Sequence, residues 1–490
     1  TPKPSSAASD VYKRQVLMFK RNNLAALAAF SAMMLPQPAF AAGLNGGELS
    51  FVWAVPFIGV LLCIAICPLV VPNFWHHHFG KVAVFWALAC AVPMFISYGG
   101  GVAVNSIAHA LIADYIPFII FVGSLYTVAG GIHIRSSFIG RPAVNTAFLA
   151  LGAVCANIMG TTGAAMLLIR PLIAANAHRR YDMHTFVFFI FIVANIAGSL
   201  TPLGDPPLFL GFLRGVEFFW TTEHLIVPML TAVGLLLLIY FIADTILFNK
   251  EKEEFLEKES HYPKEPFGID GKINFLLLAV IVSAVLMAGI WHSGVSFEIL
   301  GVHLAGEGVL RDVIFLLAAG LSLKLTSKEV REANQFGWDP ILEVGKLFFG
   351  IFVTIVPVLE MLRAGLDGAF APVVALVTNP DGSANNAMYF WMTGALSSFL
   401  DNAPTYLAFF NMAGGEAQVL MTEGAKTLMA ISMGAVFMGA NSYIGNAPNF
   451  MVLSIVQERG LKMPTFFGYL LWSGCILIPT FLLLTWLYLL

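Results

Sequence analysis

Charged residues and cysteines are both scarce in this chain. Only 11% of its 490 residues are charged, whereas soluble domains carry about 25%. The five cysteines lie in apolar segments without the spacing of metal ligands, which predicts that they are small core residues. There is no basic patch for nucleic acid and no His-Glu-x-x-His motif for a metalloprotease. With 58% hydrophobic residues, the composition indicates a polytopic membrane protein.

Runs of apolar residues such as "INFLLLAVIVSAVLMAGIW" are long enough to cross a bilayer, which takes about 20 residues per helix. Two further apolar stretches, 142–170 and 386–412, contain small and polar residues and are predicted to enter and leave the membrane on one side. The ten predicted spans are 49–71, 81–98, 104–131, 183–213, 223–248, 273–292, 309–326, 346–363, 427–456 and 464–489.

The first 42 residues read as two segments outside the membrane domain. Residues 1–17 precede the first methionine and are interpreted as a non-native leader. Residues 18–42 combine a basic start, a short apolar core and an Ala-x-Ala-like end, as secretory signal peptides do. An uncleaved first helix is the alternative. Both interpretations place Gly43 outside the cytoplasm.

With that start, the positively charged residues divide unequally between the two sides of the membrane. If both interrupted stretches are re-entrant, 17 Lys and Arg residues fall on the cytoplasmic side and 4 on the outer side. Cytoplasmic loops of membrane proteins carry such an excess. The count therefore favours two hairpins, and the predicted location is a bacterial inner membrane.

The two halves of the chain resemble each other. "GSLTPLGDPPLFL" (198–210) matches "GANSYIGNAPNFM" (439–451) at an offset of 241, and "GAVCANIMGTTGAAML" (152–167) matches "GALSSFLDNAPTYLAF" (394–409) more loosely at 242. The charge count starts the first hairpin on the cytoplasmic side and the second on the outer side. We therefore expect an all-α fold of two inverted five-helix repeats, each with a re-entrant hairpin and a broken helix, as in secondary transporters.

A charged run separates the two repeats. The predicted division is a first repeat at 43–249, a cytoplasmic linker at 250–272 and a second repeat at 273–490. Such a run of charge is typical of a solvated loop.

Four polar interruptions, which we call the breaks, occupy the hairpins and the broken spans. Gly and Pro disrupt helices there, and irregular backbone at bilayer depth is tolerated only beside protein or a water-filled cavity. Asp205 and Asp401 add carboxylates, each costing about 2.5–3.5 kcal/mol at the bilayer centre. Packing kinks would explain the prolines but not the acids beside them. A transport site is predicted where the four breaks meet: 157–163, 201–207, 398–405 and 441–449.

The segments "SSFLDNAPT", "NIMGTTGA" and "TPLGDPPLF" resemble the ion transporter superfamily, in particular NhaD-type sodium/proton antiporters and the related citrate-transport families. In that superfamily the hairpin tips and broken helices bind substrate and coupling cation without a resident cofactor, and members are commonly homodimers. Carried over by position, the resemblance implicates these binding residues: Asn157, Thr161, Thr162, Thr201, Gly204, Asp205, Ser398, Asp401, Asn402, Thr405, Asn441, Ser442 and Asn446.

Two transport functions stay open, and an enzyme is a remote third. In a sodium/proton antiporter, Na⁺ (or Li⁺) and protons would bind Asp205 and Asp401 in turn. In a citrate-like carboxylate transporter the same residues would bind the coupling cation. However, arginine is absent from all four breaks, and the Ser-Asn-Thr signature of the superfamily's dicarboxylate transporters is missing. The enzyme alternative is an intramembrane aspartyl protease, which carries a Gly-x-Gly-Asp motif. Here Pro202 stands where the first glycine of that motif belongs, which argues against a protease.

Ionisable residues also lie outside the breaks. Asp114 follows His109 in the third predicted span, and Glu360 lies in the eighth. A charge within a span is a functional candidate by default. Asp114 is therefore a candidate for a proton path, whereas Glu360 is close enough to the outer end to snorkel. Asp244 reads as an interface residue.

Overall fold

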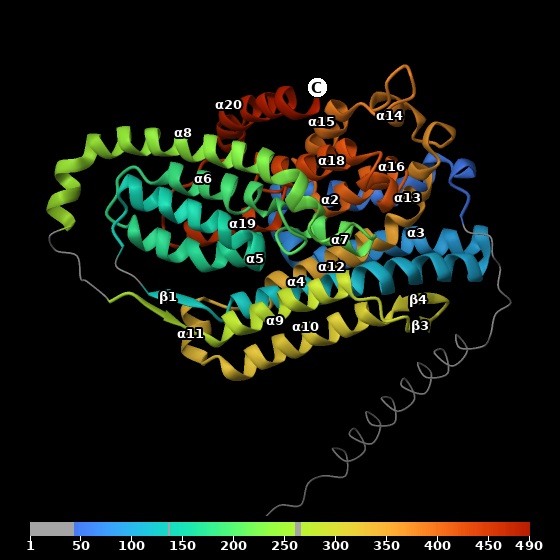
Figure 1. Cartoon of the computed structure of the whole chain (residues 1–490), viewed down its shortest axis with the longest axis horizontal. Coiled ribbons are helices and arrows are strands. Elements are labelled where there is room, and N and C mark those ends of the chain that lie inside the picture. The colour runs from blue at the N-terminus through green and yellow to red at the C-terminus, as the bar shows by residue number, and fades with distance from the viewer. Residues whose placement is uncertain (1–43, 136–137, 260–265) are drawn as a thin grey trace, which may run out of the picture.

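The computed structural model describes residues 44–135, 138–259 and 266–490 (Figure 1). The predicted leader (1–17) and signal peptide (18–42) lie outside the described residues, as does the middle of the predicted linker. Among the described residues, six helices are long and apolar enough to cross a membrane. A seventh span results if α12 and α13, bent by 46° at their junction, count as one. The chain is a helical multi-pass membrane protein.

The first half of the chain runs from two short 3₁₀ turns through a series of long helices to α8. Its helices are α2 (Val55–Val70), α3 (Pro72–His109), the π-helical turn η3 (Ala110–Tyr115), α4 (Ile116–Ala129), α5 (Pro142–Ala175), α6 (Met183–Ile192), the 3₁₀ turn η4 (Ile196–Ser199), α7 (Pro206–Leu213) and α8 (Trp220–Glu259).

The second half contains more and shorter helices. These are α9 (Ile273–Ile290), α10 (Gly306–Leu325), α11 (Lys328–Ala333), α12 (Asp339–Thr354), α13 (Val356–Arg363), α14 (Ala371–Leu376), α15 (Asn386–Ser397), α16 (Asn402–Met412), α17 (Ala417–Met421), α18 (Ala425–Met438), the 3₁₀ turn η6 (Gly439–Asn441), α19 (Ala447–Glu458) and α20 (Phe466–Leu484).

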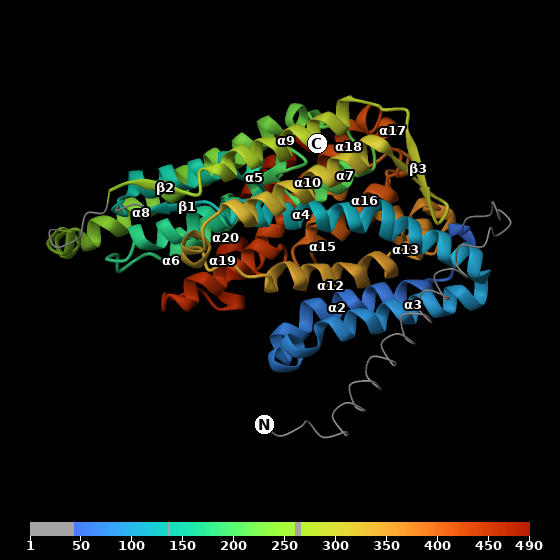
Figure 2. The ribbon, with the colours of Figure 1, turned by 90° about the horizontal axis from the view of Figure 1, so that it is seen from below.

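Long helices enclose the interrupted ones. In Figure 1, α8 and α20 run along one edge and α9 and α10 along the opposite edge, with α5, α7, α16, α18 and α19 between them. Figure 2 shows α2 and α3 packed beside α12 at one side of the molecule. The breaks predicted from sequence are therefore surrounded by protein, as irregular backbone in a membrane requires.

Two long helices bend at glycines in the left-handed region of φ. Gly99 has φ 79° inside α3, and Gly160 has φ 77° inside α5. The bend at Gly99 lies where the sequence predicted a connection between two spans, and its non-helical backbone separates two helical segments within α3. The bend at Gly160 is the tip of the first predicted hairpin. Only glycine adopts this conformation without steric cost.

Two small antiparallel sheets lie at opposite ends of the molecule. Strand β1 (His133–Arg135) pairs with β2 (Gly268–Asp270), and β3 (Ser296–Ile299) pairs with β4 (Val302–Ala305). The β1–β2 pair joins the first half of the chain to the start of the second. An Arg135–Asp270 ion pair at 2.6 Å reinforces it, and the neighbouring guanidinium lowers the pKa of Asp270.

The predicted linker is more ordered than a solvated loop. Helix α8 continues to Glu259, and β2 occupies Gly268–Asp270. Glu251 is only 5% exposed because it accepts hydrogen bonds from the side chain of Arg179 and the backbone of Arg180. The first part of the charged run thus belongs to the helical body.

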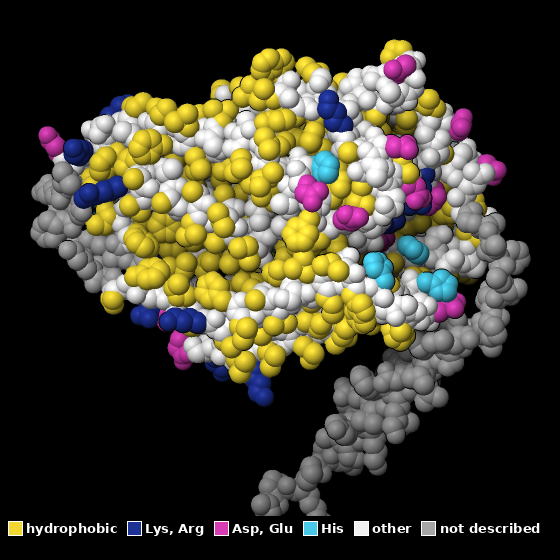
Figure 3. Space-filling view, in the orientation of Figure 1, with side chains coloured by type: hydrophobic (Ala, Val, Ile, Leu, Met, Phe, Trp, Pro, Cys, Tyr) yellow, Lys and Arg dark blue, Asp and Glu magenta, His cyan; other side chains and the backbone are white. Residues whose placement is uncertain are grey.

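The surface separates charge from apolar side chains. In Figure 3, most visible Lys and Arg side chains gather at the end that carries β1 and α11, and most Asp and Glu side chains lie toward the opposite end, near α14. A broad apolar surface lies between them. The basic side chains that the sequence assigned to the cytoplasmic side thus include those gathered at the β1 end, and the orientation itself stays a prediction.

Candidate functional site

The two broken helices restart in the same way. Asp205 is the residue before α7, with φ −146° and ψ 145°, and Asn446 is the residue before α19, with φ −154° and ψ 141°. Proline occupies both of the first two positions of α7 and the second position of α19, where its missing N–H costs no hydrogen bond. Neither side chain caps its own helix. Both side chains are therefore free to reach across the breaks.

Asp205 is the centre at which the four breaks meet. Its carboxylate is 1% exposed and accepts a hydrogen bond from Thr161 Oγ1 at 2.7 Å. It also accepts hydrogen bonds from Asn402 Nδ2 and from Asn446 Nδ2, the latter at 3.2 Å. These donors come from the first hairpin, the second hairpin and the second broken helix. Because Asn446 is the residue that the sequence repeat pairs with Asp205, the two halves meet here.

Both hairpin tips present the start of a helix to Asp205. The first tip turns at Gly160, and the backbone N–H of Thr161 donates to the Gly204 carbonyl at 2.8 Å. The second tip turns at Asp401, and Asn402 begins α16. Thr161 and Asn402 are thus equivalent at an offset of 241, one residue fewer than the looser sequence match suggested.

The hydrogen bonds around the breaks repeat at the same offset. Thr201 Oγ1 donates to the carbonyl of Asn157 at 2.7 Å. Ser442 Oγ donates in the same way to the carbonyl of Ser398. The side chains of Asn157 and Ser398 donate in turn to the carbonyls of Ala197 and Met438. The sequence repeat is therefore also a repeat of contacts.

Neighbouring helices satisfy the carbonyls that the breaks expose. Thr221 and Thr222 on α8 both donate to the carbonyl of Leu200, at 2.9 and 2.6 Å. At the equivalent position in the second half, Ser473 on α20 donates to the carbonyl of Asn441 at 2.8 Å. An unpaired backbone group in hydrocarbon costs several kcal/mol, so these hydroxyls offset much of the cost of the breaks.

Two glycine pairs let the broken segments fold back on themselves. A Cβ on Gly204 would lie 2.1 Å from the carbonyl oxygen of Gly198, and a Cβ on Gly445 would lie 2.6 Å from that of Gly439. No side chain fits at either place. Gly204 therefore serves backbone packing, and its own carbonyl accepts from Thr161.

Asp401 has a different environment from Asp205. Its Oδ1 accepts from the backbone N–H of Ala403 at 3.1 Å and so caps α16. Thr405 Oγ1 donates to the Asp401 carbonyl at 3.0 Å, one turn into the same helix. Thr162 is half-buried beside Thr161. These three implicated residues lie at the hairpin tips, but within the part of the chain that the structure describes the side chains that donate hydrogen bonds to Asp205 are those of Thr161, Asn402 and Asn446.

Two buried oxygens at the site have no hydrogen-bond partner among the described residues: Asn402 Oδ1 and Asn441 Oδ1. Asn402 is fully buried, and Asn441 is 7% exposed and donates to Ser398 Oγ at 2.9 Å. No Lys, Arg or His forms an ion pair with Asp205 within the described ranges. Beside the Asp205 carboxylate, Asn402 thus offers a free amide oxygen, and both are ligand types that hard cations prefer.

Two asparagines behind the site were not among the binding residues implicated from sequence, although Asn449 lies within the predicted break 441–449. Asn195, between α6 and η4, is fully buried and accepts a hydrogen bond from Asn446 Nδ2 at 3.2 Å. Asn449, in the first turn of α19, accepts from Asn195 Nδ2 at 2.7 Å. The available signal was the polar Asn195 at the end of the apolar run "FVFFIFIVAN", although its partners are more than 250 residues away.

Asp114 forms an ion pair rather than standing alone. It lies in the π-helical turn η3, is 4% exposed and contacts Arg214, at the end of α7, at 2.6 Å. Arg214 is nine residues after Asp205, so at 1.5 Å per residue its backbone is about 13.5 Å from that of Asp205 along the helix. The ion pair connects the broken helix to the α3–α4 segment.

A second buried ionic network lies at the other end of the hairpin, where Asp244 was expected to be an interface residue. Arg179 contacts Asp244 at 2.6 Å and also contacts Glu251, and it donates to the Gly140 carbonyl at 2.6 Å. His184 lies 2.9 Å from the same Asp244 oxygen. Arg179 and Asp244 have fully buried side chains, so this network fastens the ends of α5 to α6 and α8.

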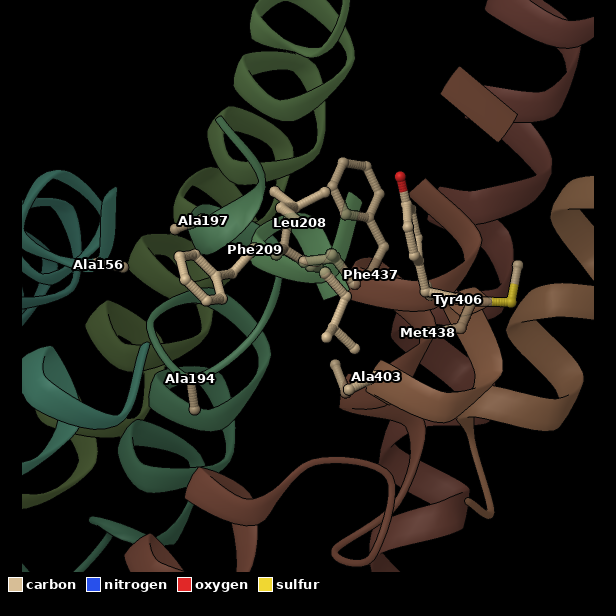
Figure 4. Close-up of a cluster of buried hydrophobic side chains, with 14 of the residues drawn as sticks. Ala156, Ala194, Ala197, Leu208, Phe209, Ala403, Tyr406, Phe437 and Met438 are labelled. Atoms are coloured by element: carbon tan, nitrogen blue, oxygen red, sulfur yellow. The ribbon is translucent and has the colours of Figure 1, made fainter. Parts of the chain in front are cut away.

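Apolar packing between the halves surrounds the polar centre. Figure 4 shows Leu208 of α7 and Phe437 of α18 near Ala403 and Tyr406 of α16. The ring of Phe209 turns away from α16 and stacks on Phe121, with ring centroids 3.8 Å apart. An apolar enclosure of this kind strengthens the electrostatic interactions inside it. Among the described residues, no group of three or more His, Cys, Asp or Glu could hold a metal ion.

Comparison with known proteins identifies a family but no individual relative. A search of curated proteins gave no match. The model of one family, described as "Putative citrate transport", matches residues 46–489, which is nearly the whole described chain and includes all four breaks. The protein belongs to this citrate-transport family of membrane transporters.

Proposed function

We propose that the protein is a secondary active transporter that exchanges Na⁺ (or Li⁺) for protons across the bacterial inner membrane. The observation that carries this proposal is the environment of Asp205, a buried carboxylate held by Thr161, Asn402 and Asn446 with no cationic side chain paired to it. A carboxylate without a counter-ion needs a cation or a proton to neutralise it inside a membrane.

The exchange follows from competition at one carboxylate. Na⁺ would bind the ionised Asp205 together with the unpartnered oxygen Asn402 Oδ1, whose amide nitrogen already donates to the same carboxylate. A proton on Asp205 removes the charge that holds Na⁺. Since the two cannot bind together, each crossing carries either a Na⁺ or a proton. The empty site would carry an uncompensated carboxylate, whose cost in the membrane disfavours its return alone, so a Na⁺ moved one way is followed by a proton moved the other. Asp401, at the tip of the second hairpin, provides a second carboxylate near the path.

A second candidate is a cation-coupled transporter of citrate-like carboxylates, which the family description favours. Helix starts also gather at the site, at Thr161, Asp205, Asn402 and Asn446, and helix N-termini attract anions. Against this candidate, the four breaks contain no arginine, and Asp205 would repel an anion placed beside it unless a cation lay between them.

Transport by the purified protein in proteoliposomes distinguishes the two candidates. Imposed Na⁺ and Li⁺ gradients are expected to drive proton movement, read with a pH-sensitive dye inside the vesicle, and a K⁺ gradient is not. Asp205→Asn, which keeps size but removes charge, should be inactive. Accumulation of labelled citrate under a Na⁺ gradient, without Na⁺-driven proton movement, would reject antiport and support the second candidate.

A further inference from the structure

Three buried asparagines form a chain that ends at Asp205. Asn449 Nδ2 donates to the carbonyls of Gly439 and Ser442, both at 2.8 Å. Asn449 Oδ1 then accepts from Asn195 Nδ2 at 2.7 Å. Asn195 Oδ1 accepts from Asn446 Nδ2 at 3.2 Å, and that same Nδ2 reaches Asp205 Oδ1 at 3.2 Å. The three amides are at most 2% exposed.

Each amide in this chain can point only one way. The partners of Asn449 Nδ2 are backbone carbonyls, which only accept hydrogen bonds, so its oxygen must face Asn195. Asn195 Nδ2 also donates to the Ile190 carbonyl at 2.8 Å, which leaves its oxygen facing Asn446. The orientation of Asn446 follows, because its Nδ2 is surrounded by acceptors only. The carbonyls of Gly439 and Ser442 therefore fix the orientation of Asn449. Through Asn195, that orientation places the amide N–H of Asn446 against Asp205.

We propose that Asn195 and Asn449 are positioning residues that orient Asn446 so that its amide N–H, and not its oxygen, faces Asp205. This inference rests on the proposed function, because it assigns to the chain of amides the balance between Na⁺ and protons at Asp205. An ionised carboxylate accepts from donors, whereas a protonated one must donate to an acceptor. With Asn446 unable to turn its oxygen toward Asp205, the protonated form lacks that acceptor and Na⁺ competes more strongly.

The test compares Asn195→Leu and Asn449→Ala with the wild type. Without the chain Asn446 can rotate, so protons compete better. The half-saturating Na⁺ concentration at pH 7 should rise about tenfold or more, in the range seen when residues behind metal ligands are removed. The pH profile of Na⁺-driven flux should move to more alkaline values. The maximal rate at saturating Na⁺ and high pH should remain, since neither residue touches the ion.

Asn274→Leu is the matched control. Asn274 is also fully buried and donates to Gly131 O, Gly271 O and Thr326 Oγ1, far from the breaks in sequence. This variant should lose stability without any change in half-saturation or pH profile. If Asn195→Leu and Asn449→Ala behave like this control, the positioning role is wrong while antiport stands.

Binding of ²²Na⁺ to the purified protein, measured from pH 6 to 9, separates this inference from the proposed function. If the wild type binds Na⁺ but does not exchange it for protons, antiport fails. The positioning role is then judged by whether the two variants weaken Na⁺ binding most at low pH. If the wild type binds no Na⁺ at any pH, both proposals are overturned.

Discussion

The substitution Asp401→Asn distinguishes two roles of this side chain, capping α16 and binding the transported cation. Asp401 caps α16 through a hydrogen bond of 3.1 Å from the N–H of Ala403. Asparagine caps helices about as well as aspartate, whereas alanine costs about 0.5–2 kcal/mol. We therefore expect the free energy of unfolding to change by less than about 0.5 kcal/mol in Asp401→Asn and to fall by about 1 kcal/mol in Asp401→Ala.

Transport should respond differently from stability. If Asp401 binds the transported cation, Asp401→Asn should lower Na⁺-dependent proton flux per folded molecule at least about tenfold, although the cap is intact. The assay is flux in proteoliposomes from pH 6 to 9, with unfolding by SDS titration in parallel. Wild-type flux in Asp401→Asn would refute the ion-binding role and leave Asp401 a cap. A loss of stability equal to that of Asp401→Ala would refute the capping argument.

Three further predictions follow from buried contacts. Arg179→Met leaves two carboxylates in a buried network and should lower the free energy of unfolding by about 3–5 kcal/mol; a loss below about 1 kcal/mol would contradict this. Gly204→Ala places a Cβ 2.1 Å from the Gly198 oxygen, so the yield of monodisperse protein on size-exclusion chromatography should collapse, and a normal yield would show that the break can adjust. Asp114→Asn deprives Arg214 of its carboxylate and should lower the melting temperature while flux per folded molecule persists; abolished flux would instead place Asp114 on a proton path.

The sequence was informative where a residue is anomalous for its surroundings. Asp205 stands out because carboxylates are costly in a membrane, and the repeat motif that contains it located the broken helices. Gly160 and Gly204 stood in the same motifs, and the structure gives each a steric reason. Such residues can be identified from sequence because a carboxylate or a helix-breaking glycine is unusual in an apolar helical segment.

The parts that sequence could not supply depend on distant partners. Asn195 is neutral and lies near ordinary loop-forming residues, so only its contacts with Asn446 and Asn449 reveal its position. Asp244 resembled an interface residue because its partner Arg179 is 65 residues away. Helix α8 likewise continues into the charged run, where Glu251 is buried against Arg179. The local pattern of charges does not predict this burial.

The contact between Asp205 and Asn446 has a consequence for how the two halves diverged. The residues are equivalent in the repeat, share their backbone conformation and touch at 3.2 Å. In a symmetric ancestor with aspartate at both positions, two carboxylates would face each other at hydrogen-bond distance and could not both be ionised. Such a pair would hold one proton between them and behave as an acid dyad. An amide at one of the two positions removes that dyad, so this single difference between the halves leaves one carboxylate that faces an amide donor and shares no proton with a second acid.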